Sequence, residues 1–267
     1  VTRSPLLGSL RVASENLKPA LEQVARAFSG LPDASAWLDD SPLVIDAALE
    51  GSLGAPRLAG TAASERLRVR SLPALNASAA FDVDATRLTV SKAAADDGAG
   101  NVFSGRAGID FEAGTTTGSF SAGLKNPTPI LTALLREARN GVTDGELKAG
   151  GSVSLTGTWD GAIDDPVVSA TINATDVALA TQAFSLERGT IEGRLDGPVS
   201  APKAEMRISA GAVGTPSLAP VPADAVLSLD AGRVEITAHV PDWSATIDGH
   251  ASMTAPHEFA AAVSVAD

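Results

Sequence analysis

The chain has 267 residues, a formal net charge of −12 and no cysteine. The acidic balance and the lack of any Lys/Arg run argue against a nucleic-acid partner and against electrostatic attachment to an anionic lipid surface. The absence of Cys excludes disulfides, thiolate metal ligands and a Cys nucleophile, and it fits an oxidising compartment.

In chain order, the first predicted element is a short amphipathic helix near 15–29, in which apolar residues recur at helical spacing and Pro19 lies in the first turn. A second helix of the same kind is predicted near 127–140, with Pro129 close to its start. Most of the remaining chain alternates apolar and polar residues with period 2, which predicts strands with one buried and one wet face. The clearest strands are predicted at 43–50, 103–111, 168–174, 204–210, 234–240, 245–253 and 259–265.

The two predicted helices occupy equivalent positions in an internal repeat. When the numbering is shifted by 110, the halves align without a gap for about sixty residues, and Gly51 falls on Gly161. Pro166 and Pro202 lie 36 positions apart, which indicates that the second half has gained one extra unit, roughly Arg188 to Pro222.

A repeat that tolerates the gain of a small unit is typical of a stacked, elongated architecture. We therefore predict an all-β fold, an elongated rolled sheet with a groove and two short amphipathic helices. The first β-groove repeat is assigned to 1–117, and the second, with the extra unit, to 118–267. Because the chain begins Val1-Thr2-Arg3 without an initiator Met, we interpret it as one continuous piece of a larger protein.

Three phrases of the sequence carry a family resemblance. They are Gly51-Ser52-Leu53-Gly54-Ala55-Pro56-Arg57-Leu58-Ala59-Gly60, then Arg87-Leu88-Thr89-Val90, then the turn Asp97-Gly98 that leads into a strand rich in small residues. Together with a short helix before the first phrase, they resemble the repeat region of the AsmA/TamB-like superfamily of cell-envelope proteins. The resemblance covers nearly the whole chain. It consists of the general residue pattern and the repeat, without an invariant motif.

The resemblance implies a β-taco, a long rolled sheet that is open along one side and has an apolar trough. It implies a non-enzymatic segment of a periplasmic bridge that conducts phospholipid between the inner and outer membranes and supports outer-membrane biogenesis. The implied partners are phospholipid acyl chains, both membranes through regions outside this chain, and an outer-membrane assembly protein of a translocation and assembly module. The implied location is the periplasm, with the parent protein anchored in the inner membrane. No part of this sequence matches the family's anchor or its terminal assembly-contacting region.

The apolar stripe of the predicted strands is either a plain core, closed on itself as a sandwich, or the lining of a groove filled by an apolar ligand. The alternation alone favours a core, whereas the repeat and the resemblance favour a groove. Ala and Gly on this stripe leave room for acyl chains, and each methylene removed from water contributes about 0.8 kcal/mol. The lipid-groove candidates are Ile45, Leu49, Leu58, Phe81, Val83, Phe103, Ile109, Phe111, Leu155, Val168, Ile172, Met206, Ile208, Leu227, Leu229, Ile236, Ile247, Phe259 and Val263.

No catalytic, metal or cofactor site is predicted, and we expect that the protein is not an enzyme. No Gly-x-Ser-x-Gly elbow and no phosphate-binding loop occurs in the sequence. His239, His250 and His257 match no metal-ligand spacing, although their strands could bring them together by pairing. The acid pairs Asp39-Asp40, Asp96-Asp97 and Asp164-Asp165 could act as glycosidase acid and base or bind Ca²⁺, but each lies at a turn-like position where Asp is favoured.

Two other functions stay open at this stage. One is a scaffolding β-repeat for outer-membrane protein assembly or secretion that carries no lipid, and the other is a surface adhesin-like β-repeat. An adhesin should show Tyr and regularly spaced acidic Ca²⁺ turns, whereas Tyr is absent and the acid pairs follow no period. Whether the apolar face is open or closed on itself separates lipid carriage from scaffolding. Trp159 and Trp243 are expected to point inward or to cap a groove rim.

Overall fold

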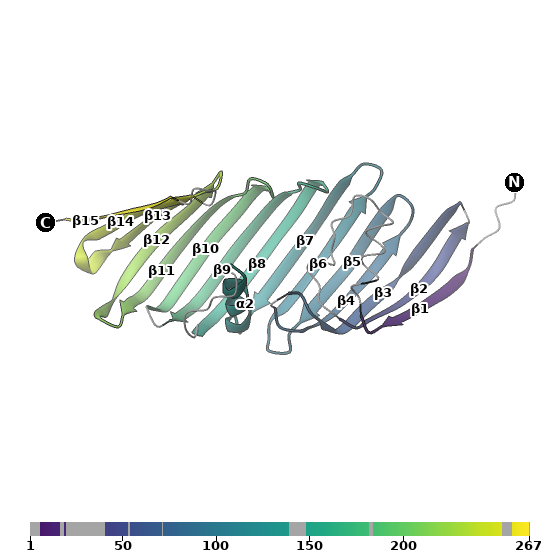
Figure 1. Cartoon of the computed structure of the whole chain (residues 1–267), viewed down its shortest axis with the longest axis horizontal. Coiled ribbons are helices and arrows are strands. Elements are labelled where there is room, and N and C mark those ends of the chain that lie inside the picture. The colour runs from purple at the N-terminus through teal and green to yellow at the C-terminus, as the bar shows by residue number, and fades with distance from the viewer. Residues whose placement is uncertain are drawn as a thin grey trace. The chain divides into compact units, whose positions relative to one another are not determined.

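The structure is a computed structural model that describes residues 6–16, 19, 41–52, 54–70, 72–138, 148–181, 184–252 and 258–266. Within these ranges the chain forms fifteen strands, and each is hydrogen-bonded to its neighbours in the sequence (Figure 1). The strand order therefore repeats the sequence order from β1 to β15, and these two strands are the edges of an open sheet. The predicted all-β fold class is confirmed.

Most neighbouring strands are joined by short connections, as expected for antiparallel hairpins, whereas longer segments separate β1 from β2 and β7 from β8. The strands are β1 (Gly8–Ser14), β2 (Leu43–Ser52), β3 (Ala55–Leu67), β4 (Leu75–Val83), β5 (Arg87–Asp96), β6 (Val102–Asp110), β7 (Thr115–Leu124), β8 (Lys148–Ala162), β9 (Val167–Ala180), β10 (Ser185–Pro198), β11 (Lys203–Thr215), β12 (Leu218–Asp230), β13 (Arg233–Val240), β14 (Ala245–Ser252) and β15 (Phe259–Val265). The helices are α2 (Thr128–Ala138) and the 3₁₀ helix η2 (Pro241–Trp243).

Contacts divide the chain into two compact units. The first comprises 1–122 with 158–166, and the second comprises 123–157 with 167–267. The extra unit that the sequence indicates at about Arg188 to Pro222 occupies most of β10, all of β11 and the start of β12 in the second unit.

Helix α2 lies within the range in which the second amphipathic helix is predicted. Its start is fixed to the first residues of β8, because the Thr128 hydroxyl donates to the Ala149 carbonyl at 2.5 Å and accepts from the Ala149 N–H at 3.0 Å. Ile130 and Ala133 are buried, one helical turn apart on the same face. The helix predicted near 15–29 lies almost entirely outside the described residues.

The glycines that recur in the sequence repeat lie where one strand turns into the next. Gly51, Gly161 and Gly197 all have positive φ angles, of +100°, +120° and +113°. In each case a proline follows five residues later and lies at the start of the next strand or just before it. A residue with a Cβ is strained at such φ angles, which explains why Gly recurs at this point of the repeat.

Replacing Gly51 with Ala should destabilise the first unit by about 1–3 kcal/mol, the usual cost of forcing a side chain into such a conformation. A Cβ at this position would also lie only 2.3 Å from the carbonyl oxygen of Ala55. Gly54 belongs to the same turn, and a Cβ there would meet no atom within 4 Å. Gly54→Ala is therefore the matched control, with an expected change within about 0.5 kcal/mol. Urea unfolding followed by circular dichroism measures both variants, and equal midpoints would contradict the strained-turn interpretation.

Candidate functional site: an apolar sheet face with an alanine-lined hollow

The register of the first unit places apolar side chains of successive strands opposite one another on one face of the sheet, here called the apolar face. Alternate residues of a strand point to opposite faces. The apolar residues of each strand must therefore be paired with apolar residues of the next strand and not with the polar residues between them. Toward one end of β3 to β6, two rows hold the bulky side chains and are called the bulky rows. The first is Leu58, Val83, Leu88 and Ile109, and the second is Gly60, Phe81, Val90 and Ala107, in which Phe81 and Val90 are large.

Farther along the same strands the aligned residues become small. One row consists of Ala62, Ala79, Ala93 and Gly105, and the next of Ser64, Ala77, Ala95 and Phe103. These two rows form the floor of a hollow of about 420 Å³, and Leu43 and Leu67 also line it. We call this feature the alanine hollow. Its volume falls within the range of about 300–1,000 Å³ that is typical of ligand pockets.

Strand irregularities lie at the borders of the alanine hollow. The register of β5 shifts between Val90 and Lys92 against β4 and between Val90 and Ala93 against β6, so that a bulge at Ser91 and Lys92 separates the bulky rows from the small rows. A second shift in β3, between Ser64 and Leu67, lies at the far end. Because bulges bend a strand and increase its local twist, they separate this floor from the rows on either side.

The second unit carries an apolar face of the same kind, with larger side chains. Ile208 of β11 lies opposite Ile191 on one side and Ala225 on the other, and Leu227 lies opposite both Met206 and Ile236. Exposure alternates strictly along β13, where the polar residues are exposed and the apolar ones are half-buried or buried. The pleat therefore separates the two faces completely.

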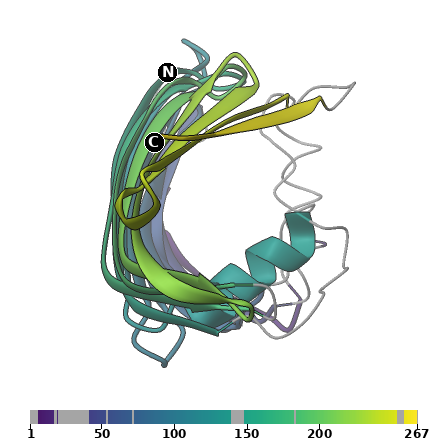
Figure 2. The ribbon, with the colours of Figure 1, turned by 90° about the vertical axis from the view of Figure 1, so that its left-hand side faces the viewer.

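The strands of the second unit are curved along their length, and helix α2 lies beside one end of them on the concave side (Figure 2). No second sheet packs on the apolar residues within the described part of the chain, yet these side chains are half-buried or buried. A concave surface exposes less of each side chain than a convex one. We therefore assign the apolar face to the concave side of this curved sheet.

Eighteen of the nineteen lipid-groove candidates lie on strands, on the apolar face of their respective units. The exception is Phe111, which lies outside a strand. Phe111 follows β6 and lies in a turn, where its N–H donates to the Thr86 carbonyl at 2.7 Å. All the others belong to strands, and most are half-buried. Phe259 and Val263 of β15 are instead exposed, at 76% and 67%.

The small residues of the alanine hollow were not among those candidates, because only large apolar side chains were chosen from the sequence. The sequence carries only part of the signal, that of a single strand. Ala77 and Ala79 have the same strand parity as Phe81, and a run of small residues at that parity indicates an empty volume beside the backbone.

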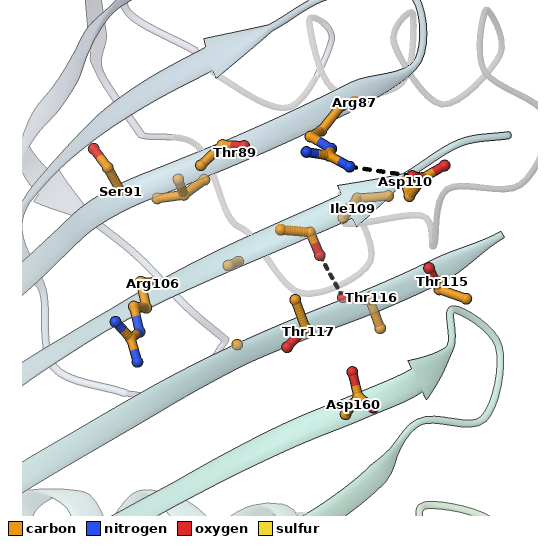
Figure 3. Close-up of a pocket in the computed structure, with 14 residues that line it drawn as sticks. Arg87, Thr89, Ser91, Arg106, Ile109, Asp110, Thr115, Thr116, Thr117 and Asp160 are labelled. Atoms are coloured by element: carbon orange, nitrogen blue, oxygen red, sulfur yellow. Dashed lines mark hydrogen bonds and ion pairs between the residues drawn. The ribbon is translucent and has the colours of Figure 1, made fainter. Parts of the chain in front are cut away.

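The opposite face of the first unit is polar, and it also contains a hollow, of about 540 Å³. Arg87, Arg106, Thr117 and Asp160 are among the residues that line it (Figure 3). Both arginines have partners within the sheet: Arg87 lies 3.5 Å from Asp110, and the Arg106 guanidinium donates to the Ser119 hydroxyl at 3.0 Å.

Cross-strand polar pairs lie on the polar face of each unit. Hydroxyls face each other in the pairs Ser104–Ser121, Ser152–Thr175 and Thr156–Thr171, at 2.7, 3.0 and 3.0 Å. Such pairs stabilise neighbouring strands by roughly 0.2–1 kcal/mol each. They identify this face as the solvated side of the sheet.

The acid pair Asp96-Asp97 caps a turn. The Asp97 carboxylate accepts hydrogen bonds from the N–H groups of Ala99 and Asn101, at 2.8 and 3.1 Å, and from the Asn101 side-chain amide at 2.6 Å. Burial alone would raise the pKa of Asp97, but these hydrogen bonds outweigh it and hold the pKa below its ordinary value. The hydrogen bonds of this carboxylate therefore stabilise the turn in which it lies. Its partner Asn101 is fully buried.

The histidines and acid pairs singled out in the sequence do not gather into a cluster among the described residues. Within the described ranges, no three His, Cys, Asp or Glu side chains come close enough to hold a metal ion. His239 lies opposite Thr246 and His250 opposite Glu235, whereas His257 and the pair Asp39-Asp40 lie outside the described residues. Trp243 belongs to η2 and is 45% exposed, so it does not lie on a strand as its sequence context suggests.

Trp159 lies on the apolar face. Its indole N–H donates to the Thr116 hydroxyl at 3.0 Å, and its ring stacks on Phe120 with centroids 6.2 Å apart. The ring also covers Gly118, where a Cβ would lie 2.1 Å from it. A glycine here makes space for the indole, a contact between strands that the sequence pattern did not reveal.

Within the part of the chain that the structure describes, no helix is both long and apolar enough to cross a bilayer. Comparison with known protein families, with curated proteins and with solved structures finds no match to this chain. The two faces of the sheet are therefore the features from which a function can be inferred.

Asp97→Asn should destabilise the protein at pH 7 by about 1 kcal/mol, the net worth of a typical hydrogen bond. Because the folded state lowers the pKa of Asp97, its contribution is fully present above the unfolded pKa of about 3.9 and is lost as the pH falls through the lower folded value. The stability difference between the wild type and the variant should therefore shrink between pH 5 and pH 2. Thermal unfolding across this range measures it, with the exposed Asp164→Asn as control. A difference that stays constant with pH would contradict the capping role.

Proposed function

We propose that this chain is a non-enzymatic segment of a periplasmic bridge in the bacterial cell envelope, and that its apolar face carries the acyl chains of phospholipids between the inner and outer membranes. One observation carries the proposal: each unit presents a face of aligned apolar side chains that no second layer covers within the described residues. Contiguous apolar faces of this kind mark interaction or ligand surfaces.

The physical chemistry of the face suits lipid tails. Burial of apolar area contributes about 25 cal/mol per Å², independent of the protein's net charge, so an acidic protein can hold an uncharged chain. Aliphatic side chains repeated from strand to strand offer many similar, weak positions. A series of equivalent positions permits movement, because no single one holds the tail much more strongly than the next.

A scaffolding role without lipid carriage is the second candidate, and the exposed edge of β15 favours it. The seven residues from Phe259 to Val265 contain no charge, and all of them are exposed. An uncharged, apolar edge strand is a template for pairing with a strand from another chain. In this alternative, the protein would contact assembly machinery through that edge.

Native mass spectrometry of the purified chain, with extraction and identification of bound lipid, tests the proposal. We expect phospholipid at a reproducible stoichiometry. Ile172→Asp, which places a carboxylate on the apolar face of β9, should reduce the bound fraction about tenfold or more, because burying an unpaired charge is costly.

Thr171→Asp is the matched control, since Thr171 is the next residue of β9 and is exposed on the opposite face. This variant should retain its lipid, and circular dichroism establishes that both variants are folded. A wild-type chain that purifies as a stable, lipid-free monomer would contradict lipid carriage and favour the scaffolding role.

A further inference from the structure

Among the described residues, one buried hydroxyl on the apolar face has no hydrogen-bond partner. Ser64 is 7% exposed, and its Oγ is buried without a hydrogen-bond partner within the described residues. Leaving a polar group buried and unpaired is unfavourable, and native proteins do so rarely. A serine at a position where the neighbouring rows carry Ala, Val or Leu therefore calls for a reason.

The position of Ser64 relates it to the alanine hollow. It lies directly opposite Ala77 in the register, belongs to the second of the two small rows and is one of the residues that line the hollow. A serine side chain can change between its staggered rotamers. An acceptor atom that enters the hollow would therefore be able to satisfy this hydroxyl.

The lining of the hollow selects the kind of acceptor. It consists of Ala, Leu, Phe, Gly and Ser and contains no Lys, Arg or His among its described residues. A carboxylate or phosphate buried here would lack a counter-charge, and an unpaired buried ion is strongly disfavoured. A neutral carbonyl oxygen attached to a hydrocarbon chain fits both the apolar floor and the single donor.

We propose that the alanine hollow is a specific lipid subsite, in which an acyl chain lies on the two small rows and the ester carbonyl of a glycerolipid accepts a hydrogen bond from Ser64. This inference deepens the proposed function, on which it rests, by naming the ester linkage as the group that is recognised. The rest of the apolar face offers only apolar contacts, whereas this subsite would hold the junction between the lipid tail and its headgroup at one position.

A pair of lysophospholipids isolates the carbonyl. 1-Palmitoyl-lysophosphatidylcholine and its 1-O-hexadecyl ether analogue have the same headgroup and hydrocarbon chains of the same length, but only the first has an ester carbonyl. Titration calorimetry on the full chain, below the micellar concentration, should show about three- to tenfold tighter binding of the ester, the range expected for one net hydrogen bond.

Ser64→Ala should bring the ester down to the affinity of the ether and leave the ether unchanged. It should also leave the free protein as stable as the wild type or more stable, because the unpaired hydroxyl is removed. Ser91→Ala is the matched control, since Ser91 is an exposed serine that lines the polar hollow on the other face and not the alanine hollow, and neither affinity should change.

Ala79→Leu fills the floor of the hollow and should weaken both lysolipids, whereas Thr61→Leu, on the exposed face of the neighbouring strand, should weaken neither. If the wild type binds the ester and the ether equally, or if Ser64→Ala leaves their ratio unchanged, the subsite is wrong while lipid carriage stands. If neither lysolipid binds and no phospholipid is recovered from the purified chain, the proposed function itself fails.

Discussion

The pleat of the β-strand is the constraint on which the rest of this structure depends. Successive side chains point to opposite faces, so a shift of one residue in any pairing would move the apolar set of that strand to the polar side. The register avoids this, as the alignment of Leu227 with Met206 and Ile236 illustrates. At the bulges of β3 and β5, one extra residue changes which alternate positions are apolar, and the apolar side chains beyond the bulge therefore return to the same face.

Sequence-order pairing confines most interactions to neighbouring strands. Each strand is stabilised by the backbone ladder and by cross-strand pairs with the strands before and after it, as in repeat proteins whose stability is a sum of local terms. An added hairpin such as β10–β11 can then be accommodated without rebuilding a central core. The recurrence of Gly51, Gly161 and Gly197 at positive φ shows that the turn, as well as the strand pattern, belongs to the repeated unit.

Much of this architecture could be predicted from the sequence, because period-2 alternation and glycine-proline spacing are local signals. The all-β class, the position of α2 and the shared face of the large apolar residues follow from them. The alanine hollow could not be located in this way, because it depends on which small residues become neighbours across four strands. That alignment depends on the bulge at Ser91 and Lys92, and the position of a bulge cannot be predicted from an alternating sequence pattern. The cover of Trp159 over Gly118 depends on register in the same way.

The apolar face also links stability to occupancy. In a sandwich, the apolar residues of one sheet are buried by the other, and this burial is a large part of the folding free energy. Here, among the described residues, the same side chains are aligned and half-buried but lack a second layer. Any apolar ligand that covers them binds the folded chain and not the unfolded one, and so it stabilises the fold in proportion to the logarithm of its concentration. A sheet that leaves this face to a ligand thereby favours the folded state most where that ligand is supplied, which under the proposed function is lipid, whereas a closed core would fold equally well without it.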